Sequence, residues 1–344
     1  MGHQGMIGDV KPLIIAEVAQ AHDGSLGIAH SYIDAVAKVG CDAVKFQTHI
    51  AGEESSPEEP WRVNFSYQDK TRMDYWRRME FSPEEWAGLK THAEDKGLFF
   101  ISSPFSLAAV DLLKSIGVKA WKVASGETSN LRLIEKMAET KLPVLLSSGM
   151  SSYNELDLAV EMVKNMGAPL GVFQCSSKYP TPPSEIGLNI LRELTDRYSC
   201  PVGLSDHSGK IFAPLAAISR GAHFVEVHVT FHEDMFGPDT VASLTIAELE
   251  QLVAGARFIA KALSSPVKKD EIEQDFDSMR GMFQQGLVAA NDIAEGEELT
   301  RENLTFRKPC KGIPAKEFFE VIGSRASCPI RKGEFIHQNQ VIQR

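Results

Sequence analysis

Eight short apolar runs recur along this chain of 344 residues, and each gives way to a segment with helical spacing of its apolar residues. The runs are LIIAEVA (13–19), AVKFQT (43–48), LFFISS (98–103), AWKVAS (120–125), PVLLSS (143–148), GVFQCS (171–176), PVGLSD (201–206) and HFVEVHVT (223–230). Eight β units that alternate with α units within about 260 residues predict a (β/α)8 TIM barrel. A doubly wound open sheet is the alternative, but the sequence lacks the GxGxxG or P-loop motif of its first turn.

Two stretches break this regular pattern. Residues 49–81 form a long insertion after the second run, acidic and proline-rich at first and then aromatic and basic. Loops of this length typically cover a site or make a subunit contact. Residues 264–276 are polar and charged, and the chain beyond 286 changes to short β-like pieces with glycine turns. We therefore predict a TIM-barrel catalytic domain over 1–263, a linker over 264–285 and a small β-rich domain over 286–344.

Composition restricts the class of partner. The net charge is −10, which argues against a nucleic-acid or anionic-membrane partner. No apolar run approaches the roughly 18–20 residues that span a bilayer, and the first residues lack the apolar core of a signal peptide. The five cysteines are odd in number and form no CxxC pair, which favours reduced thiols. We expect a cytoplasmic protein.

Polar residues interrupt several of the predicted strands. Strand side chains alternate between two faces, so some of these residues must project together. The pairs that share a face are Lys45 with Gln47, Ser205 with His207, and Glu226 with His228; Glu17 and Lys122 interrupt two further strands. Charged groups inside a barrel are costly unless paired, and the carboxyl ends of barrel strands form active sites. The sequence therefore predicts a polar site at that end of the barrel.

The residue types indicate two kinds of ligand. Lysines with serine hydroxyls suit a phosphate or carboxylate group, and two histidines from adjacent strands with oxygen ligands suit a divalent ion such as Mn²⁺. Structural explanations exist for each residue. A lysine in a strand can extend its ammonium group to the surface, and a histidine at a strand end can form a structural hydrogen bond. Glu17 can form a structural ion pair with Lys45 or Lys122. Cys175 has no evident histidine base, so we expect a small buried apolar residue there.

Several motifs carry a resemblance to a known family. They are IIAEVAQAHDGSL (14–26), VKFQTH (44–49), WKVASGE (121–127), LLSSGMSS (145–152), CSSKYPTPP (175–183), GLSDHS (203–208), the VEVHVTF…FGPD segment (225–239) and NLTFRKPCKGIP (303–314). In order, and over nearly the whole chain, they resemble the sialic acid (N-acetylneuraminate) synthase family. The last motif resembles the antifreeze-like (SAF, β-clip) domain of that family.

The resemblance implies an activity and a set of roles. Family members join phosphoenolpyruvate to an N-acetylated amino sugar, release phosphate and form domain-swapped homodimers. By resemblance, His207 and His228 bind the metal, Mn²⁺ with Mg²⁺ or Co²⁺ as alternatives. Phosphoenolpyruvate contacts Lys45, Ser103, Lys122, Ser125, Ser147, Ser177 and Ser205; the sugar contacts Glu17, Gln47, Tyr179, Asp239 and Lys308; and the catalytic set is Glu17, Glu226, His207 and His228.

Departures from the family pattern lie on the sugar side. Ser177 stands where an Asn is frequent, AHDG (21–24) stands where NHNG is common, and Lys308, beside Arg307, stands where an Arg is expected. A lysine does not reproduce the bidentate guanidinium fork. The sugar stays open between N-acetylmannosamine and a 2,4-diacetamido-trideoxyhexose, as in legionaminic or pseudaminic acid synthases. A 3-deoxy-octulosonate-type synthase and a non-catalytic glycan- or ice-binding protein are further alternatives.

Overall fold

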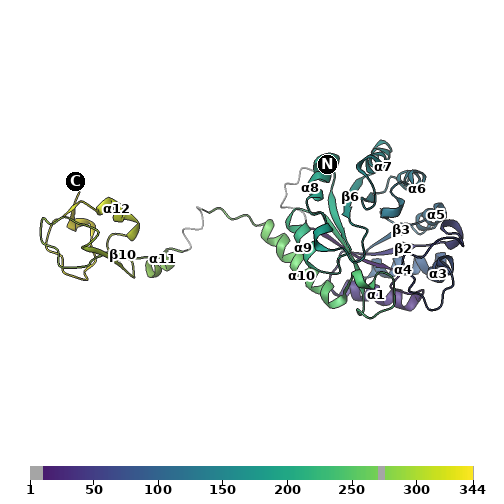
Figure 1. Cartoon of the computed structure of the whole chain (residues 1–344), viewed down its shortest axis with the longest axis horizontal. Helices are drawn as coiled ribbons and strands as arrows, with labels where there is room; N and C mark the ends of the chain where they lie inside the picture. The colour runs from purple at the N-terminus through teal and green to yellow at the C-terminus, as the bar shows by residue number, and fades with distance from the viewer. Residues whose placement is uncertain (1–10, 270–275, 344) are drawn as a thin grey trace. The chain divides into compact units, whose positions relative to one another are not determined.

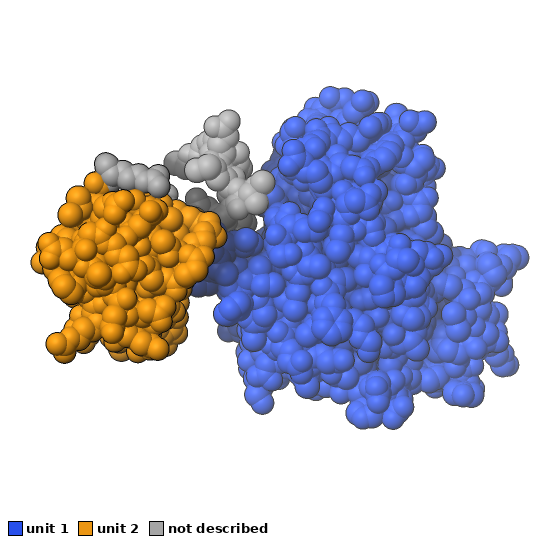
Figure 2. All heavy atoms as spheres, turned by 60° about the vertical axis from the view of Figure 1, so that its left-hand side comes forward, with its two compact units in different colours: residues 1–265 blue, residues 266–344 orange. Residues whose placement is uncertain are grey.

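A computed structural model describes residues 11–269 and 276–343 of the protein. The chain divides into two compact units, Met1–Ser265 and Pro266–Arg344, which are coloured separately in Figure 2. The helix α11 (Asp277–Phe283) falls within the predicted linker over 264–285, so part of that segment is helical.

The first unit is a closed parallel barrel (Figure 1). Its strands are β1 (Leu13–Ala19), β2 (Ala43–Thr48), β3 (Phe99–Pro104), β4 (Trp121–Val123), β5 (Val144–Ser147), β6 (Leu170–Cys175), β7 (Val202–Asp206) and β8 (Phe224–Thr230). Each strand pairs with the next in sequence, and β1 pairs with β8, which closes the barrel. A short further strand, β9 (Ser243–Thr245), extends from β8. The predicted TIM barrel is confirmed.

Amphipathic helices cover the outside of the barrel. They are α1 (Leu26–Lys38), α4 (Pro83–Asp95), α5 (Leu107–Ser115), α6 (Leu131–Ala138), α7 (Tyr153–Asn165), α8 (Ile190–Tyr198), α9 (Phe212–Ser219) and α10 (Ile246–Leu263). Capping boxes, each a Ser or Thr with a Glu three residues later, begin α4, α7 and α10. Within the described residues, no helix is long and apolar enough to cross a membrane.

The insertion after β2 is an ordered cluster. It contains α2 (Ala51–Glu54) and α3 (Arg72–Met79), and the buried side chains of Tyr75, Trp76 and Met79 pack with Trp61 and Phe65. A capping box begins α3 and so fixes the start of the helix that carries these buried aromatic side chains. The aromatic character of the segment therefore reflects a small core of its own beside the barrel.

The second unit has its own apolar core and short antiparallel sheets. The strand β10 (Gly286–Ala289) pairs with β11 (Leu304–Arg307), and β12 (Arg325–Ala326) pairs with β13 (Val341–Ile342). One short helix, α12 (Phe318–Val321), packs beside them. The unit consists of short strands, as predicted, and the last of them covers only Val341–Ile342.

The barrel interior changes from apolar to charged along the strands. Its lower layer consists of Ile15, Ala43, Ile101, Phe173 and Phe224, packed with Leu13 and Leu145. Two residues further along several strands, alternation brings charged or hydroxyl side chains inward. Glycines leave room for Phe224, since a Cβ on Gly203 would stand 1.9 Å from its Cδ2 and 2.3 Å from its carbonyl oxygen. This packed floor supports the polar layer above it.

Replacing Gly203 by alanine should destabilise the barrel. The new methyl group would overlap both the ring and the backbone of Phe224, so we expect the free energy of unfolding to fall by about 1–3 kcal/mol or more. Urea unfolding followed by circular dichroism measures this change. The matched control is Gly88→Ala within α4, where the added Cβ meets nothing within 4 Å and should stabilise the helix by about 0.5–1 kcal/mol. Equal effects of the two changes would contradict this description of the floor.

Candidate active site

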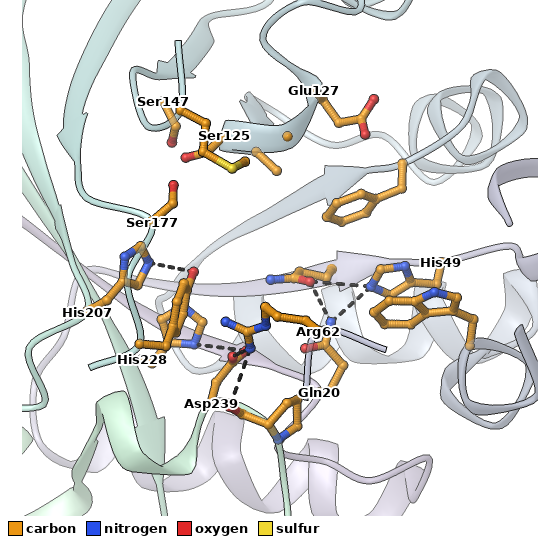
Figure 3. A pocket seen from close by; sticks show the side chains of 18 of the residues that line it. Gln20, His49, Arg62, Ser125, Glu127, Ser147, Ser177, His207, His228 and Asp239 are labelled. Atoms are coloured by element: carbon orange, nitrogen blue, oxygen red, sulfur yellow. Dashed lines mark hydrogen bonds and ion pairs between the residues drawn. The ribbon is translucent and has the colours of Figure 1, made fainter. Parts of the chain in front are cut away.

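A cavity of about 390 Å³ opens at the carboxyl ends of the barrel strands (Figure 3). Most of the predicted site residues line it, namely Lys45, Gln47, Lys122, Ser125, Ser147, Ser177, Tyr179, Ser205, His207, Glu226, His228 and Asp239. They come from six of the eight strands or the segments just after them. The structure thus brings residues far apart in sequence into one site.

Three of the predicted residues are not on the cavity wall. Glu17 is fully buried below it and forms an ion pair with Lys45. Ser103 is 1% exposed at the end of β3, and its hydroxyl has no hydrogen-bond partner. Lys308 belongs to the second unit, where its Nζ lies 5.5 Å from the ring centroid of Phe283. These three roles stay predictions.

Two buried lysines share one carboxylate. The Nζ atoms of Lys45 and Lys122 lie 3.6 and 3.5 Å from Oε1 of Glu226. The ammonium of Lys122 also donates to Ser147 Oγ at 2.5 Å, and Ser205 Oγ donates to Glu226 Oε1 at 3.1 Å. The second carboxylate oxygen of Glu226 is buried without a partner. A buried acceptor without a partner is costly, so this oxygen is placed for a ligand.

Burial and charge shift the pKa values of this group. Burial lowers the pKa of Lys45 to about 8, although the nearby Glu226 opposes the shift. Burial alone would raise the pKa of Glu226, but the charges of Lys122 and Lys45 more than offset it and hold that pKa well below its usual range. Near neutral pH the cavity therefore presents an ionised Glu226 and a cationic Lys45.

Two histidines lie together on the cavity wall. The ring centroids of His207 and His228 are 5.2 Å apart. The ring of Tyr179 stacks on His207 with ring centroids 4.2 Å apart, and the Tyr179 hydroxyl lies 2.9 Å from His207 Nε2. Burial, followed by the charge of His207, lowers the pKa of His228 well below its usual value. His228 is therefore neutral near pH 7, the state in which an imidazole binds a metal.

The histidine side has features of a divalent-metal site. The carbonyl of Ser176 lies 2.8 Å from His207 Nδ1, an orienting contact common for metal-binding histidines, and the other ring nitrogen, Nε2, contacts the Tyr179 hydroxyl. Asp239 Oδ2 lies 3.8 Å from His228 Nδ1 and could supply an oxygen ligand. Among the residues that the structure describes, no three or more His, Cys, Asp or Glu side chains are arranged as a preformed metal site. Two nitrogen ligands with open oxygen positions suit an ion such as Mn²⁺ better than a closed structural zinc site.

The position of Cys175 differs from the sequence-based expectation in one respect. A histidine is close by, since Cys175 Sγ lies 3.9 Å from His207 Nδ1, whereas the sequence indicated no such partner. That nitrogen is already engaged by the Ser176 carbonyl at 2.8 Å. His207 is therefore a poor base for this thiol, and the buried Cys175 fills space between the two halves of the site.

The structure adds residues that sequence reasoning missed. Arg62, from the insertion, donates to Asp239 Oδ1 at 2.5 Å, and its guanidinium lies 4.3 Å from the centroid of the Tyr179 ring. His49 stacks between Trp76 and Phe105, with ring centroids at 4.1 and 4.5 Å. The VKFQTH motif already contained His49. No pattern in the sequence indicated Arg62, because the insertion has no strand register to place its side chains.

Comparison with known proteins agrees with this geometry. The NeuB family model matches residues 32–268, and the SAF domain model matches residues 284–342. The N,N'-diacetyllegionaminic acid synthase of Campylobacter jejuni is 33% identical, over 95% of this chain and 99% of its own. The N-acetylneuraminate-9-phosphate synthase of Homo sapiens is 32% identical, over 95% of this chain and 92% of its own. The crystal structure of an N-acetylneuraminic acid synthetase from Leptospira borgpetersenii superposes with a TM-score of 0.69 at 30% identity, over 78% of this chain and 92% of that one.

A TIM barrel with a lysine- and histidine-lined mouth, joined to a SAF domain, defines the class of sialic-type (nonulosonic) acid synthases. The chain belongs to the NeuB family.

The charge of Lys45 should make phosphate binding depend on pH. Lys45 is cationic below its pKa of about 8 and neutral above it, so phosphoenolpyruvate should bind more weakly as pH rises. We expect the dissociation constant to rise by up to about tenfold per pH unit above pH 8, since one pH unit changes the charged fraction tenfold. Calorimetric titration between pH 7 and 9.5 measures this. Lys45→Met should bind weakly with no inflection near pH 8, and a wild-type profile without that inflection would contradict the prediction.

Proposed function

We propose that the protein condenses phosphoenolpyruvate with an open-chain N-acetylated amino sugar and water. The products are a nine-carbon 2-keto acid and phosphate, released by cleavage of a C–O bond. The observation that carries this proposal is one cavity whose wall holds two buried lysines, which share Glu226, and two neighbouring histidines. Two substrates of different chemistry can meet there, one at the lysines and one at the histidines.

The lysine side suits phosphoenolpyruvate. Lys45 and Lys122 provide cationic charge for its phosphate and carboxylate, and lysine binds phosphate as a compact point charge. The hydroxyls that would add hydrogen bonds belong to Ser125, Ser147, Ser177 and Ser205, all on the cavity wall. Glu17 holds the ammonium of Lys45 from below and so positions it. Ser103 stays an expected contributor, since its buried hydroxyl has no partner.

The histidine side suits the sugar aldehyde. His207 and His228 would hold a divalent ion, Mn²⁺ with Mg²⁺ or Co²⁺ as alternatives, which polarises the aldehyde when bound. Gln47, Tyr179 and Asp239 surround this position and have polar atoms for the sugar hydroxyls. We assign Lys308 of the second unit to the sugar as well, on the ground of its place in the family motif.

The chemistry follows from these contacts. The enol carbon of phosphoenolpyruvate bonds to the aldehyde carbon, which leaves a cationic centre at the adjacent carbon of the enolpyruvate unit. Water adds to that centre, and the resulting tetrahedral intermediate expels phosphate as the keto group forms. The unpaired Oε2 of Glu226 can stabilise the cation and accept a proton from the water, and the former aldehyde oxygen takes up a proton to become a hydroxyl of the product. Lys45 and Lys122 stabilise the departing phosphate.

Two sugars fit this proposal. N-acetylmannosamine would make the protein an N-acetylneuraminate synthase. A 2,4-diacetamido-trideoxyhexose would make it a legionaminic or pseudaminic acid synthase, and the 33% identity to the Campylobacter jejuni diacetyllegionaminic acid synthase favours this second candidate.

A substrate panel tests the activity. Purified protein with Mn²⁺, phosphoenolpyruvate and either sugar should release phosphate and form a nine-carbon keto acid, detected by mass spectrometry. His228→Ala should lower kcat by about 100-fold or more, since the polarising ion would lose one of its two nitrogen ligands, while circular dichroism shows an intact fold. Phosphate release without any sugar, or with unchanged rate in His228→Ala, would contradict the proposed reaction or the metal role respectively.

We also propose a homodimer in which the SAF domain of each chain covers the barrel of its partner, as the family resemblance implies. The proposal predicts a particle of about twice 37.9 kDa in analytical ultracentrifugation at micromolar concentration. Lys308→Ala should then raise the KM for the sugar and leave the KM for phosphoenolpyruvate unchanged. A monomer with full activity would contradict the proposal.

A further inference from the structure

A chain of polar contacts leads from the insertion along the cavity wall and ends at a residue assigned to the sugar. Its members are Glu54 in α2, His49 just after β2, Gln20 just after β1, and Gln47 on β2. All four line the cavity, and Figure 3 shows Gln20 and His49 turned toward each other there. His49 is only 3% exposed and lies between two aromatic rings. We call this chain the His49 relay.

The contacts of His49 assign the proton on its ring. Nδ1 lies 2.6 Å from Oε1 of Glu54, whose other oxygen accepts from the backbone N–H of Ile50 at 3.3 Å. A carboxylate only accepts hydrogen bonds, so Nδ1 carries the proton. Nε2 lies 2.9 Å from the amide nitrogen of Gln20, which only donates. Glu54 therefore selects the tautomer of His49 that can accept from Gln20.

The Gln20 amide in turn fixes the orientation of Gln47. Its nitrogen also donates to Oε1 of Gln47, and this oxygen lies 3.3 Å from His49 Nε2. The Gln20 amide thus holds together two acceptors that would repel each other without it. With its oxygen engaged, Gln47 keeps its amide nitrogen for a ligand, since within the described part of the chain that nitrogen makes no hydrogen bond. Gln47 presents two N–H donors at the cavity wall.

Packing alone would not require a histidine at this position. The two flanking rings would stack equally on a phenylalanine. The imidazole adds a hydrogen bond at each of its nitrogens, one toward the insertion and one toward the barrel. Because these groups are buried, loss of one contact leaves the next member without its partner. The relay therefore makes the orientation of Gln47 depend on His49.

We propose that His49 is a positioning residue for the amino sugar, which acts through Gln20 on the amide of Gln47. Glu54 holds His49 in the required tautomer, so the insertion influences a sugar-binding residue of the barrel. The group that Gln47 would bind is a hydrogen-bond acceptor of the sugar, either a hydroxyl or an N-acyl carbonyl oxygen. This inference rests on the proposed function and concerns residues to which the family resemblance gave no role.

The experiment is a double-mutant cycle on the full-length protein with Mn²⁺, in which the KM values for the amino sugar and for phosphoenolpyruvate are measured separately. His49→Phe keeps the aromatic stack and removes both hydrogen bonds. We expect it to raise the KM for the sugar about three- to tenfold, as for one lost hydrogen bond, with the KM for phosphoenolpyruvate unchanged. In a Gln47→Ala background the same change should alter the sugar KM less than about twofold, because the relay then has nothing to position.

Three further variants separate the relay from general effects on the fold. Gln20→Met interrupts the relay at its second contact and should reproduce the sugar effect, which keeps the test decisive if His49→Phe does not fold. Glu54→Ala should also raise the KM for the sugar, and Glu54→Gln, which keeps an oxygen that can accept from Nδ1, should restore most of that loss. The matched control is Glu53→Ala, one position earlier on the exposed side of α2, which should leave both KM values unchanged.

Two results would overturn the positioning role and leave the proposed condensation standing. One is an equal effect of His49→Phe with and without Gln47. The other is an equal rise in both KM values, which a loosened insertion would cause. Absence of turnover with every sugar would overturn the proposed function, and the positioning role with it.

Discussion

The site depends on a buried network of two lysines and two glutamates in the barrel interior. Lys45 lies between Glu17 and Glu226, and Lys122 reaches Glu226 from the other side. Isolated charges at this depth would be strongly unfavourable, whereas neighbouring opposite charges with hydroxyl partners are tolerated. Because loss of one member would leave another uncompensated, the network ties β1, β2, β4 and β8 to a single arrangement. Two carboxylate oxygens of the network, Oε1 of Glu17 and Oε2 of Glu226, are buried without partners, and because Glu226 lines the cavity, its free oxygen is the point at which a substrate can bind.

The register of the strands places these charged side chains at the same height along the barrel axis. Glu17 stands beside Lys45 on β2 and beside His228 on β8. The apolar floor below, with Phe224 seated against Gly203, keeps water away from the underside of the network. Alternation along each strand turns one residue inward into the apolar layer and the residue two positions later inward into the polar layer. The packing that stabilises the barrel and the geometry of the site therefore have the same origin.

Much of this arrangement could be predicted from the chain alone. The eight strands lie within one or two residues of their predicted positions, because short apolar runs with polar ends have a strong periodic signal. Alternation also placed Lys45 with Gln47, and Glu226 with His228, on the interior face, and all four line the cavity. The insertion carried no such signal. Arg62 and Asp239 are 177 positions apart in the sequence, and no local pattern relates them.

The sequence by itself determined the barrel, the face of each strand and the residue types at its mouth, since these depend on local periodicity and on the cost of burying charge. Only the tertiary structure decided which charges neutralise which. It showed that Glu226 is shared by both lysines, that Arg62 is engaged by Asp239, and that Glu127 forms no ion pair within the described part of the chain. Charge compensation depends on distances of a few ångströms between distant segments, and only packing sets such distances.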